Sequence, residues 1–247
     1  MRRYPSSYPS SFSFGPGPLS SALKAIIGAN VAIFLAQAVF DPALIGLLGL
    51  QPRLVVHGWV WQLATYMFLH GGLFHILFNM LALWMFGTEL EHVWGTRYFV
   101  KFYFVTGIGA GVLTVVLSLL PFEFTRPLYG SNIIGASGAI YGILLAYALY
   151  FPERQIILVV FPVPAKYAVM IIGAIAFYSS FSDSGRGIAN ATHLGGLLVG
   201  YVFLKGARVH PLAELKYRYL KWKINRVRKK FDVYSGGRND DWDRHVH

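Results

Sequence analysis

The stretch FVKFYFVTGIGAGVLTVVLSLL, residues 99–120, contains a single charged side chain, Lys101. A transmembrane helix needs about 20 consecutive apolar residues to cross the hydrocarbon core of a bilayer. The apolar side chains form a continuous run and do not alternate with polar ones, which argues against a strand of a membrane barrel. Pro121 ends the run. The stretch therefore predicts a membrane-spanning helix.

Five more apolar stretches of about span length lie on either side of this one. They are approximately Leu19–Phe40, Gly72–Gly87 (extended by Thr88–Val93), Ile134–Phe151, Ile156–Phe177 and Ile188–Leu204. The stretch 156–177 is disturbed by Pro162 and Pro164. Because backbone in lipid must be helical unless it closes a barrel, the sequence predicts an all-α membrane protein with six transmembrane helices.

The composition of the 247 residues agrees with this class. Only 13% of the residues are charged, against about 25% in soluble domains. Hydrophobic residues make up 55% of the chain, and the mean hydropathy is +0.49. This composition argues against an ordinary soluble enzyme and against a disordered chain. The absence of cysteine excludes a disulfide, a zinc–thiolate site and a cysteine nucleophile.

Two tails are expected around a membrane domain at residues 19–206. Residues 1–18 are rich in Pro, Ser and Gly, and we expect a flexible cytoplasmic tail that is not a cleavable signal peptide. Residues 207–247 are basic, and within 212–231 apolar side chains recur at helical spacing between cations. This pattern predicts an amphipathic helix on the inner membrane surface. A helix that binds a protein partner is the alternative.

The distribution of Lys and Arg predicts the orientation. If the N-terminus is cytoplasmic, 19 of the 22 cations lie in inside segments, and the outside segments hold only Arg53, Arg126 and Arg186. Cytoplasmic loops are the ones enriched in Lys and Arg, so both termini are expected inside, which requires an even number of spans. Twelve cations follow the last apolar run, a position that favours anionic lipid over nucleic acid as their partner.

The connection 41–71 is the longest one between two predicted spans. It contains Trp59 and Trp61 among alternating apolar residues, unlike a solvated linker. Trp is enriched at the level of the lipid headgroups. We therefore expect a re-entrant or interfacial first outer loop.

Four polar side chains lie within three predicted spans, where they are costly and need a reason. His75 and Asn79 are four residues apart and share a helix face. Ser137 begins the fourth span, and His193 lies in the sixth. With the predicted orientation all three spans run inward, so the four groups lie at one depth, a little below the outer surface. Taken singly, each could be a packing or hydrogen-bonding residue.

The spacing of small residues predicts that two of these spans approach closely. Gly138 and Gly142 form one small-xxx-small pair, and Gly196 and Gly200 form another. Close approach could bring the Ser137 hydroxyl to His193, and a serine nucleophile needs such a base. Because no carboxylate lies within a span core, we expect a Ser–His dyad and not a triad. His75 and Asn79 could then donate hydrogen bonds to the oxyanion of an acyl-transfer intermediate.

At these residues the chain resembles the rhomboid family of intramembrane serine proteases. The matching stretches, in order, are HGGLFHILFNM (70–80), GTELEHVWG (87–95), GASGAIYG (135–142) and ANATHLGGLLVGY (189–201). The resemblance implies a six-helix rhomboid bundle with Ser137 as nucleophile and His193 as general base. It implies an oxyanion hole of His75, Asn79 and the Ser137 backbone N–H, with Tyr141 stacked on His193 and Gly135 allowing a tight turn.

The resemblance also implies the substrates and the setting. Single-span membrane proteins would be cleaved near the outer leaflet, in a bacterial inner membrane, with lipids as the other partner and with no metal, cofactor or nucleic acid. The stretch 156–177 and the loop 179–187 resemble the lateral gate and the cap of the family. One departure is Gln62, which follows Trp61 where the family commonly has an arginine that braces the loop. A catalytically silent relative that binds transmembrane helices is the alternative, and a small transporter or channel is a second.

Overall fold

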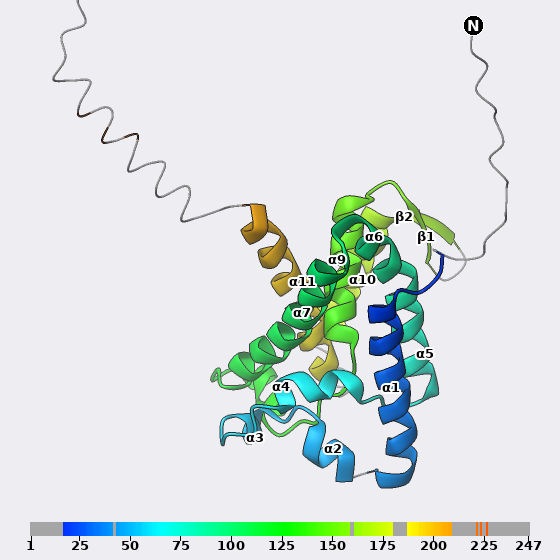
Figure 1. Cartoon of the computed structure of the whole chain (residues 1–247). Helices are drawn as coiled ribbons and strands as arrows, with labels where there is room; N and C mark the ends of the chain where they lie inside the picture. Colours follow the sequence, from blue (N-terminus) through cyan, green and yellow to red (C-terminus); the bar gives the residue numbers. More distant parts are fainter. Residues whose placement is uncertain are drawn as a thin grey trace, which may run out of the picture. The chain divides into compact units, whose positions relative to one another are not determined.

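The computed structural model describes residues 17–41, 43–158, 161–179 and 187–208, together with Lys221, Lys223 and Arg226. The chain divides into two compact units, Met1–Leu204 and Lys205–His247. The first unit is a bundle of helices (Figure 1). Most of both predicted tails, 1–18 and 207–247, lies outside the described residues, so the predictions made for them stay predictions.

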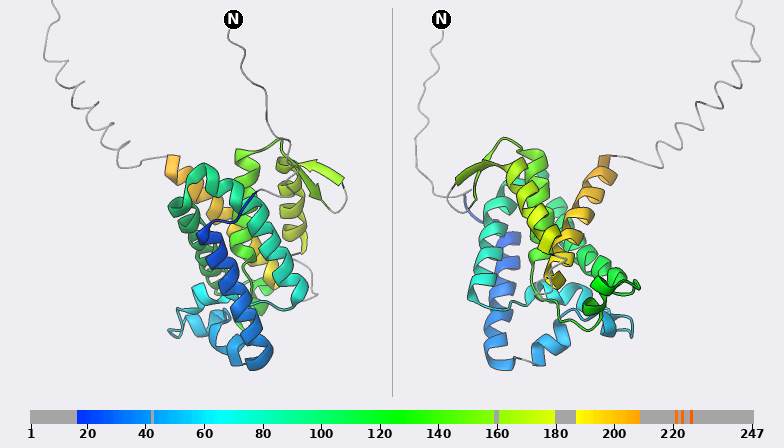
Figure 2. Two further views of the ribbon diagram at one scale, coloured as in Figure 1. Left: turned by 45° about the vertical axis from the view of Figure 1, so that its right-hand side comes forward. Right: turned by 180° about the vertical axis from the view of Figure 1, so that it is seen from behind.

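A helix lies in each of the six predicted apolar stretches. α1 runs toward the end of the first unit where the short helices of the connection 41–71 lie, and α5 returns from there (Figures 1 and 2). The long elements are α1 (Ser21–Phe40), the continuous run of α5 (Leu73–Ala82), the π-helical turn η2 (Leu83–Gly87) and α6 (Thr88–Trp94), then α7 (Thr96–Ser118), α9 (Ser137–Tyr150), α10 (Ala165–Ser179) and α11 (Gly187–Arg208).

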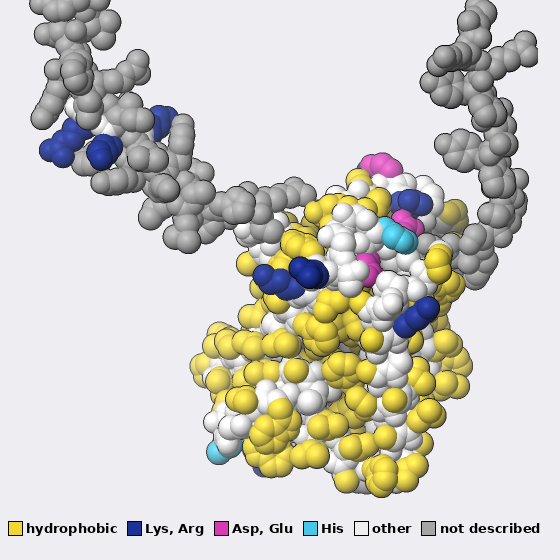
Figure 3. Space-filling model, in the orientation of Figure 1, with side chains coloured by type: hydrophobic (Ala, Val, Ile, Leu, Met, Phe, Trp, Pro, Cys, Tyr) yellow, Lys and Arg dark blue, Asp and Glu magenta, His cyan; other side chains and the backbone are white. Residues whose placement is uncertain are grey.

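Three of these helical runs are long and apolar enough to cross a bilayer, namely Ser21–Phe40, Leu73–Trp94 and Thr96–Ser118. α9 and α10 are apolar but shorter, at 14 and 15 residues. On the face drawn in Figure 3, hydrophobic side chains cover most of the surface, and the acidic side chains gather toward its upper end. These features are those of an integral membrane protein, and the count of six spans stays a prediction.

Glu91, which is only 6% exposed, joins the ends of three helices. Its Oε2 accepts a 2.7 Å hydrogen bond from the Ser20 hydroxyl, and its Oε1 accepts a 2.6 Å bond from the Thr96 hydroxyl. Ser20 in turn caps α1 by accepting from the backbone N–H of Leu23. One carboxylate of α6 therefore fixes the start of α1 and the start of α7.

The predicted helix at 156–177 is wrong in its first part. Residues Gln155–Leu158 (β1) and Phe161–Pro164 (β2) form an antiparallel hairpin, and α10 begins only at Ala165. Pro162 and Pro164 lack the N–H group that a helix needs, and each disfavours helical backbone in the residue before it. The apolar run alone did not reveal this, since a hairpin and a helix can share the same hydropathy.

The connection 41–71 is built of short helices. They are α2 (Ala43–Leu48), α3 (Pro52–Val55), α4 (Gln62–Thr65) and the 3₁₀ turn η1 (Tyr66–Phe68). The loop is tied to itself by Trp61, whose indole N–H donates to the Leu47 carbonyl at 3.0 Å. α3 and α4 pack against α7. The re-entrant or interfacial position of this loop in the membrane stays a prediction.

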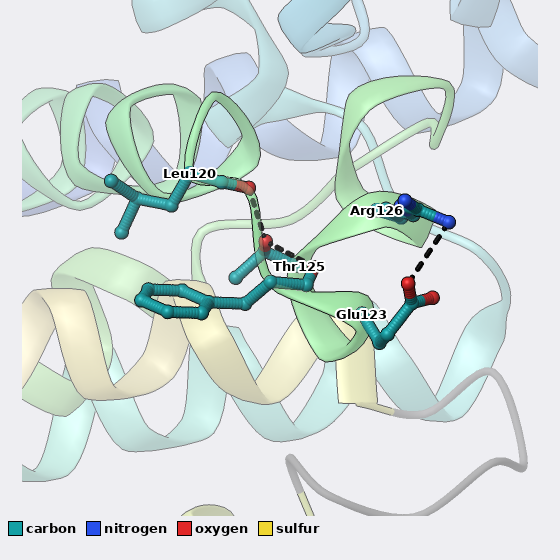
Figure 4. Close-up of polar contacts among 5 residues, drawn as sticks. Leu120, Glu123, Thr125 and Arg126 are labelled. Atoms are coloured by element: carbon teal, nitrogen blue, oxygen red, sulfur yellow. Dashed lines mark hydrogen bonds and ion pairs between the residues drawn. The ribbon is translucent and has the colours of Figure 1, made fainter.

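The connection from α7 to α9 contains the 3₁₀ turn η3 (Glu123–Thr125) and the short helix α8 (Arg126–Tyr129). The buried Thr125 hydroxyl lies 2.8 Å from the Leu120 carbonyl, to which it donates a hydrogen bond (Figure 4). Arg126 and Glu123 form a 3.0 Å ion pair, but both side chains are largely exposed. Such surface pairs contribute little, so the turn is held mainly by Thr125, whose hydroxyl also bonds the Phe122 carbonyl at 2.8 Å.

Candidate active site

Ser137 is the first residue of α9, directly after a sharp turn of the backbone. Gly135 has a φ of +123°, a conformation that residues with a side chain rarely adopt. The N–H of Gly135 donates a 2.9 Å hydrogen bond to the carbonyl oxygen of Tyr66. The turn therefore presents Ser137 at a helix N-terminus, where unpaired N–H groups and the helix dipole favour negative charge.

His193 of α11 meets this serine. Its Nε2 lies 2.8 Å from the Ser137 hydroxyl oxygen. The rings of His193 and Tyr141 are stacked, with 4.2 Å between centroids and 9° between planes. Since Tyr141 is one helical turn after Ser137 on α9, one helix supplies both the hydroxyl and the ring that orients the imidazole.

Glycines allow α9 and α11 to approach closely, as their spacing predicts. A Cβ added to Gly196 would meet the carbonyl oxygen of Gly138, and a Cβ added to Gly200 would lie 3.2 Å from the Cα of Gly142. Side chains at either position would separate the two backbones. The prediction of close contact at these two small-residue pairs is confirmed.

The hydrogen bond between Ser137 and His193 can form with either tautomer of the neutral imidazole. In the tautomer that accepts the serine proton at Nε2, the ring proton is on Nδ1. Nδ1 is buried and has no hydrogen-bond partner among the described residues. Within the part of the chain that the structure describes, no carboxylate bonds this second nitrogen.

His75 of α5 lies on the other side of the serine turn. The Gly71 N–H donates to its Nδ1 at 3.2 Å, so the ring proton is on Nε2. A Cβ added to Gly135 would lie 2.8 Å from this Nε2 and 3.7 Å from the Ser137 hydroxyl oxygen. A donor N–H therefore lies against the same turn that carries Ser137, and only glycine leaves room for it.

Asn79 lies one helical turn after His75 on α5. Its side chain is 6% exposed, and its amide nitrogen has no hydrogen-bond partner among the described residues. A buried amide donor without a partner is costly.

Two neighbours of the site were missed at the sequence level. Tyr66 holds Gly135 through its carbonyl oxygen, and its hydroxyl donates a 2.7 Å bond to the Gly107 carbonyl. Gln37 clamps the backbone of His70 by accepting from its N–H and donating to its carbonyl. Because these bonds use backbone atoms, no residue pattern could indicate them.

His70 is also a part of the surroundings of His75. Its ring centroid lies 5.0 Å from that of His75, in an edge-on arrangement. Burial, together with the nearby His75, lowers the pKa of His70 to about 4. His70 is therefore neutral at physiological pH and brings no positive charge to the site.

Comparison with known proteins gives consistent matches. Residues 57–207 match the rhomboid domain. The mitochondrial rhomboid protein 1 of Saccharomyces cerevisiae is 33% identical over 137 residues, which are 55% of this chain and 38% of that protein. The rhomboid protease GluP of Bacillus subtilis is 33% identical over 151 residues, 61% of this chain and 27% of that protein.

A third relative is the rhomboid protease GlpG of Yersinia pestis. It is 32% identical over 145 residues, which are 57% of this chain and 46% of that protein. The chain thus matches less than half of the length of each of these three relatives. Residues 57–207, which match the rhomboid domain, include α9 and all of α11 except its last residue.

Proposed function

This chain belongs to the rhomboid family, and on that premise we propose that it is an intramembrane serine endopeptidase. It hydrolyses peptide bonds of single-span membrane proteins near the outer leaflet, with Ser137 as nucleophile and His193 as general base. The observation that carries the proposal is the 2.8 Å separation of the Ser137 hydroxyl oxygen and His193 Nε2. Two of the relatives above carry the name of rhomboid protease.

The proposed reaction proceeds by acyl transfer. The Ser137 oxygen attacks the scissile carbonyl carbon while its proton moves to His193 Nε2. The imidazolium then gives this proton to the leaving amine, and the substrate's acyl part stays on Ser137 as an ester. Water, activated by the same nitrogen, hydrolyses the ester and restores the hydroxyl.

The imidazolium needs stabilisation that a triad would take from a carboxylate. The Tyr141 ring is stacked on the His193 ring, with 4.2 Å between the ring centroids. The electron-rich face of an aromatic ring attracts a cation. Tyr141 would therefore both orient the base and stabilise its charged form. This explains how a two-residue machinery could work without an acidic third member.

The oxyanion of the tetrahedral intermediate would be bound by donors on both sides of the serine turn. These are the Nε2–H of His75, the amide of Asn79 and the backbone N–H of Ser137. The amide of Asn79 has no partner among the described residues, which suits a donor reserved for the intermediate. Donors fixed in advance around a developing charge supply a large part of catalysis.

The setting that we propose is a bacterial inner membrane with both termini in the cytoplasm. The support for this orientation is the distribution of Lys and Arg, 19 of 22 on the inner side. The three spans that carry the site residues then start at the outer face, from which water can reach Ser137. Lipids would be the permanent partner of the apolar surface.

The direct test of this function is cleavage of a reporter. Purified protein in detergent is incubated with a generic single-span membrane protein, and the products are analysed by gel and mass spectrometry. We expect one or a few discrete cuts near the outer end of the reporter's span. A well-folded protein that binds reporters and cuts none would favour the alternative, a catalytically silent member that binds transmembrane helices.

Asn79→Ala is expected to lower kcat without abolishing cleavage. Loss of one oxyanion donor typically costs about 10²–10³ in rate, and the donors of His75 and Ser137 remain. The measurement is kcat per titrated active site on the same reporter. The matched control is Asn30→Ala, which removes another fully buried amide, on α1. It should change thermal stability and leave kcat per site unaltered, and an unaltered kcat for Asn79→Ala would make Asn79 a structural residue.

A further inference from the structure

Gln62, the first residue of α4, has a fully buried side chain. Its Oε1 accepts a 3.0 Å hydrogen bond from the backbone N–H of Gln51. Its Nε2 donates to the carbonyl oxygens of Gly46 and Leu47 at 3.3 and 3.4 Å. One amide thus holds both ends of the segment 46–51, at the position where the family commonly has an arginine.

This segment is paired directly with the chain that leads to Ser137. Leu50, next to Gln51, exchanges two backbone hydrogen bonds with Ile133, each 2.9 Å long. Ile133 precedes Gly135 by two residues, and the Gly135 N–H is held by the carbonyl of Tyr66. The approach to the serine turn is therefore fixed at two points, and both belong to the outer loop.

The Ile134 side chain also lies beside the segment 46–51, next to Gly49. A Cβ added to Gly49 would lie 3.4 Å from Cγ2 of Ile134 and 2.5 Å from the backbone oxygen of Ile45. Ile134 lies between the two fixed points, Ile133 and Gly135. A shift of the segment 46–51 would therefore be transmitted to the serine turn.

We propose that Gln62 is a positioning residue for Ser137, acting through the Leu50–Ile133 pair. The inference rests on the proposed protease function. Gln62 holds the backbone of Gln51, and the neighbouring Leu50 is hydrogen-bonded to the backbone of Ile133. The position of Ile133 in turn determines where the following turn places Ser137. An acyl-transfer site needs its nucleophile within a fraction of an ångström of the productive position. The buried amide of Gln62, with its three backbone partners, would provide that precision although it lies outside the site.

The test replaces Gln62 by methionine, which has a similar volume and none of the three hydrogen bonds. Active serines are counted by complete reaction with a fluorophosphonate, and kcat and KM for the reporter are then referred to that count. We expect kcat per active serine to fall by about tenfold or more with little change in KM, because small displacements of reacting groups are costly. A residue that merely stabilises the fold would lower the number of active serines and leave kcat per serine unchanged.

The matched control is Thr65→Val. The Thr65 hydroxyl donates a 2.7 Å bond to the Leu48 carbonyl, so the variant loses a bond to the same segment without releasing Gln51. Its kcat per serine should stay near the wild-type value. An equal loss in both variants, or no loss in Gln62→Met, would overturn the proposal.

If no Ser137 of the Gln62→Met variant reacts with the fluorophosphonate, the variant Gly49→Ala tests the proposal instead. Its methyl group must displace the backbone at Ile45, next to the segment 46–51, and it should lower kcat per serine in the same way. An unchanged kcat there would overturn the proposal. A wild-type protein that cuts no reporter is a separate outcome, because it contradicts the protease function itself.

Discussion

Ser137→Ala is expected to reduce cleavage of the reporter to the uncatalysed background. The variant lacks the oxygen that attacks the substrate, and no other group of the site can take its place. The fold should persist, because alanine is smaller than serine and suits a helix start, and the lost hydrogen bond to His193 lies at a partly exposed position. The measurements are cleavage over many hours and the thermal unfolding midpoint.

The matched control for this variant is Ser118→Ala near the end of α7. Ser118 is buried, and its hydroxyl donates a 2.6 Å bond to the Val115 carbonyl, so the control removes a hydrogen-bonded serine hydroxyl away from His193. It should cleave at nearly the wild-type rate. Cleavage by Ser137→Ala at a comparable rate would remove Ser137 from the mechanism.

Gly196→Ala is expected to lower kcat by about 10²-fold or more, since a displacement near 1 Å at the reacting groups has this effect. The added methyl group would meet the carbonyl oxygen of Gly138 and lie 3.2 Å from its Cα. Backbone atoms cannot rotate away, so α11 must move from α9. His193 lies on α11 and Ser137 on α9, so the 2.8 Å distance between His193 Nε2 and the Ser137 hydroxyl oxygen would lengthen. The measurement is kcat for the reporter.

The control variant is Gly28→Ala, which makes the same glycine-to-alanine change where the added methyl group meets no other atom. A Cβ at Gly28, on the exposed side of α1, has no atom within 4 Å. Alanine also favours a helix over glycine, so this variant should keep both its activity and its thermal stability. Full activity of Gly196→Ala would mean that α9 and α11 can separate without loss, contrary to the role given to their glycine contact.

The sequence predicted the helices and much of the site because both depend on local patterns. Continuous apolar runs located six helices to within a few residues, apart from the first part of the stretch 156–177. Glycine spacing predicted the contact of α9 with α11. The agreement in depth of four polar residues predicted a common site, and the structure brings Ser137, His193 and His75 around one turn.

The remaining features depend on contacts between distant segments, which no local pattern reveals. The Gly135 turn is held by the carbonyl of Tyr66, and the loop that carries Tyr66 is joined to Ile133 through the backbone of Leu50. The hairpin of β1 and β2 replaces a helix because Pro162 and Pro164 disfavour helical backbone in spite of the apolar run. At Gln62, where the family commonly has an arginine that braces the loop, the buried amide makes three hydrogen bonds to the loop backbone.

The central claim is that His193 activates Ser137, and one labelling experiment tests it most directly. Wild-type protein and His193→Ala are treated with a fluorophosphonate in detergent, and the labelled residue and the labelling rate are determined by mass spectrometry. Because the reagent reacts with an activated hydroxyl, we predict rapid labelling of Ser137 in the wild type and a rate lower by orders of magnitude in His193→Ala. Equal labelling of Ser137 in the two proteins would contradict the account.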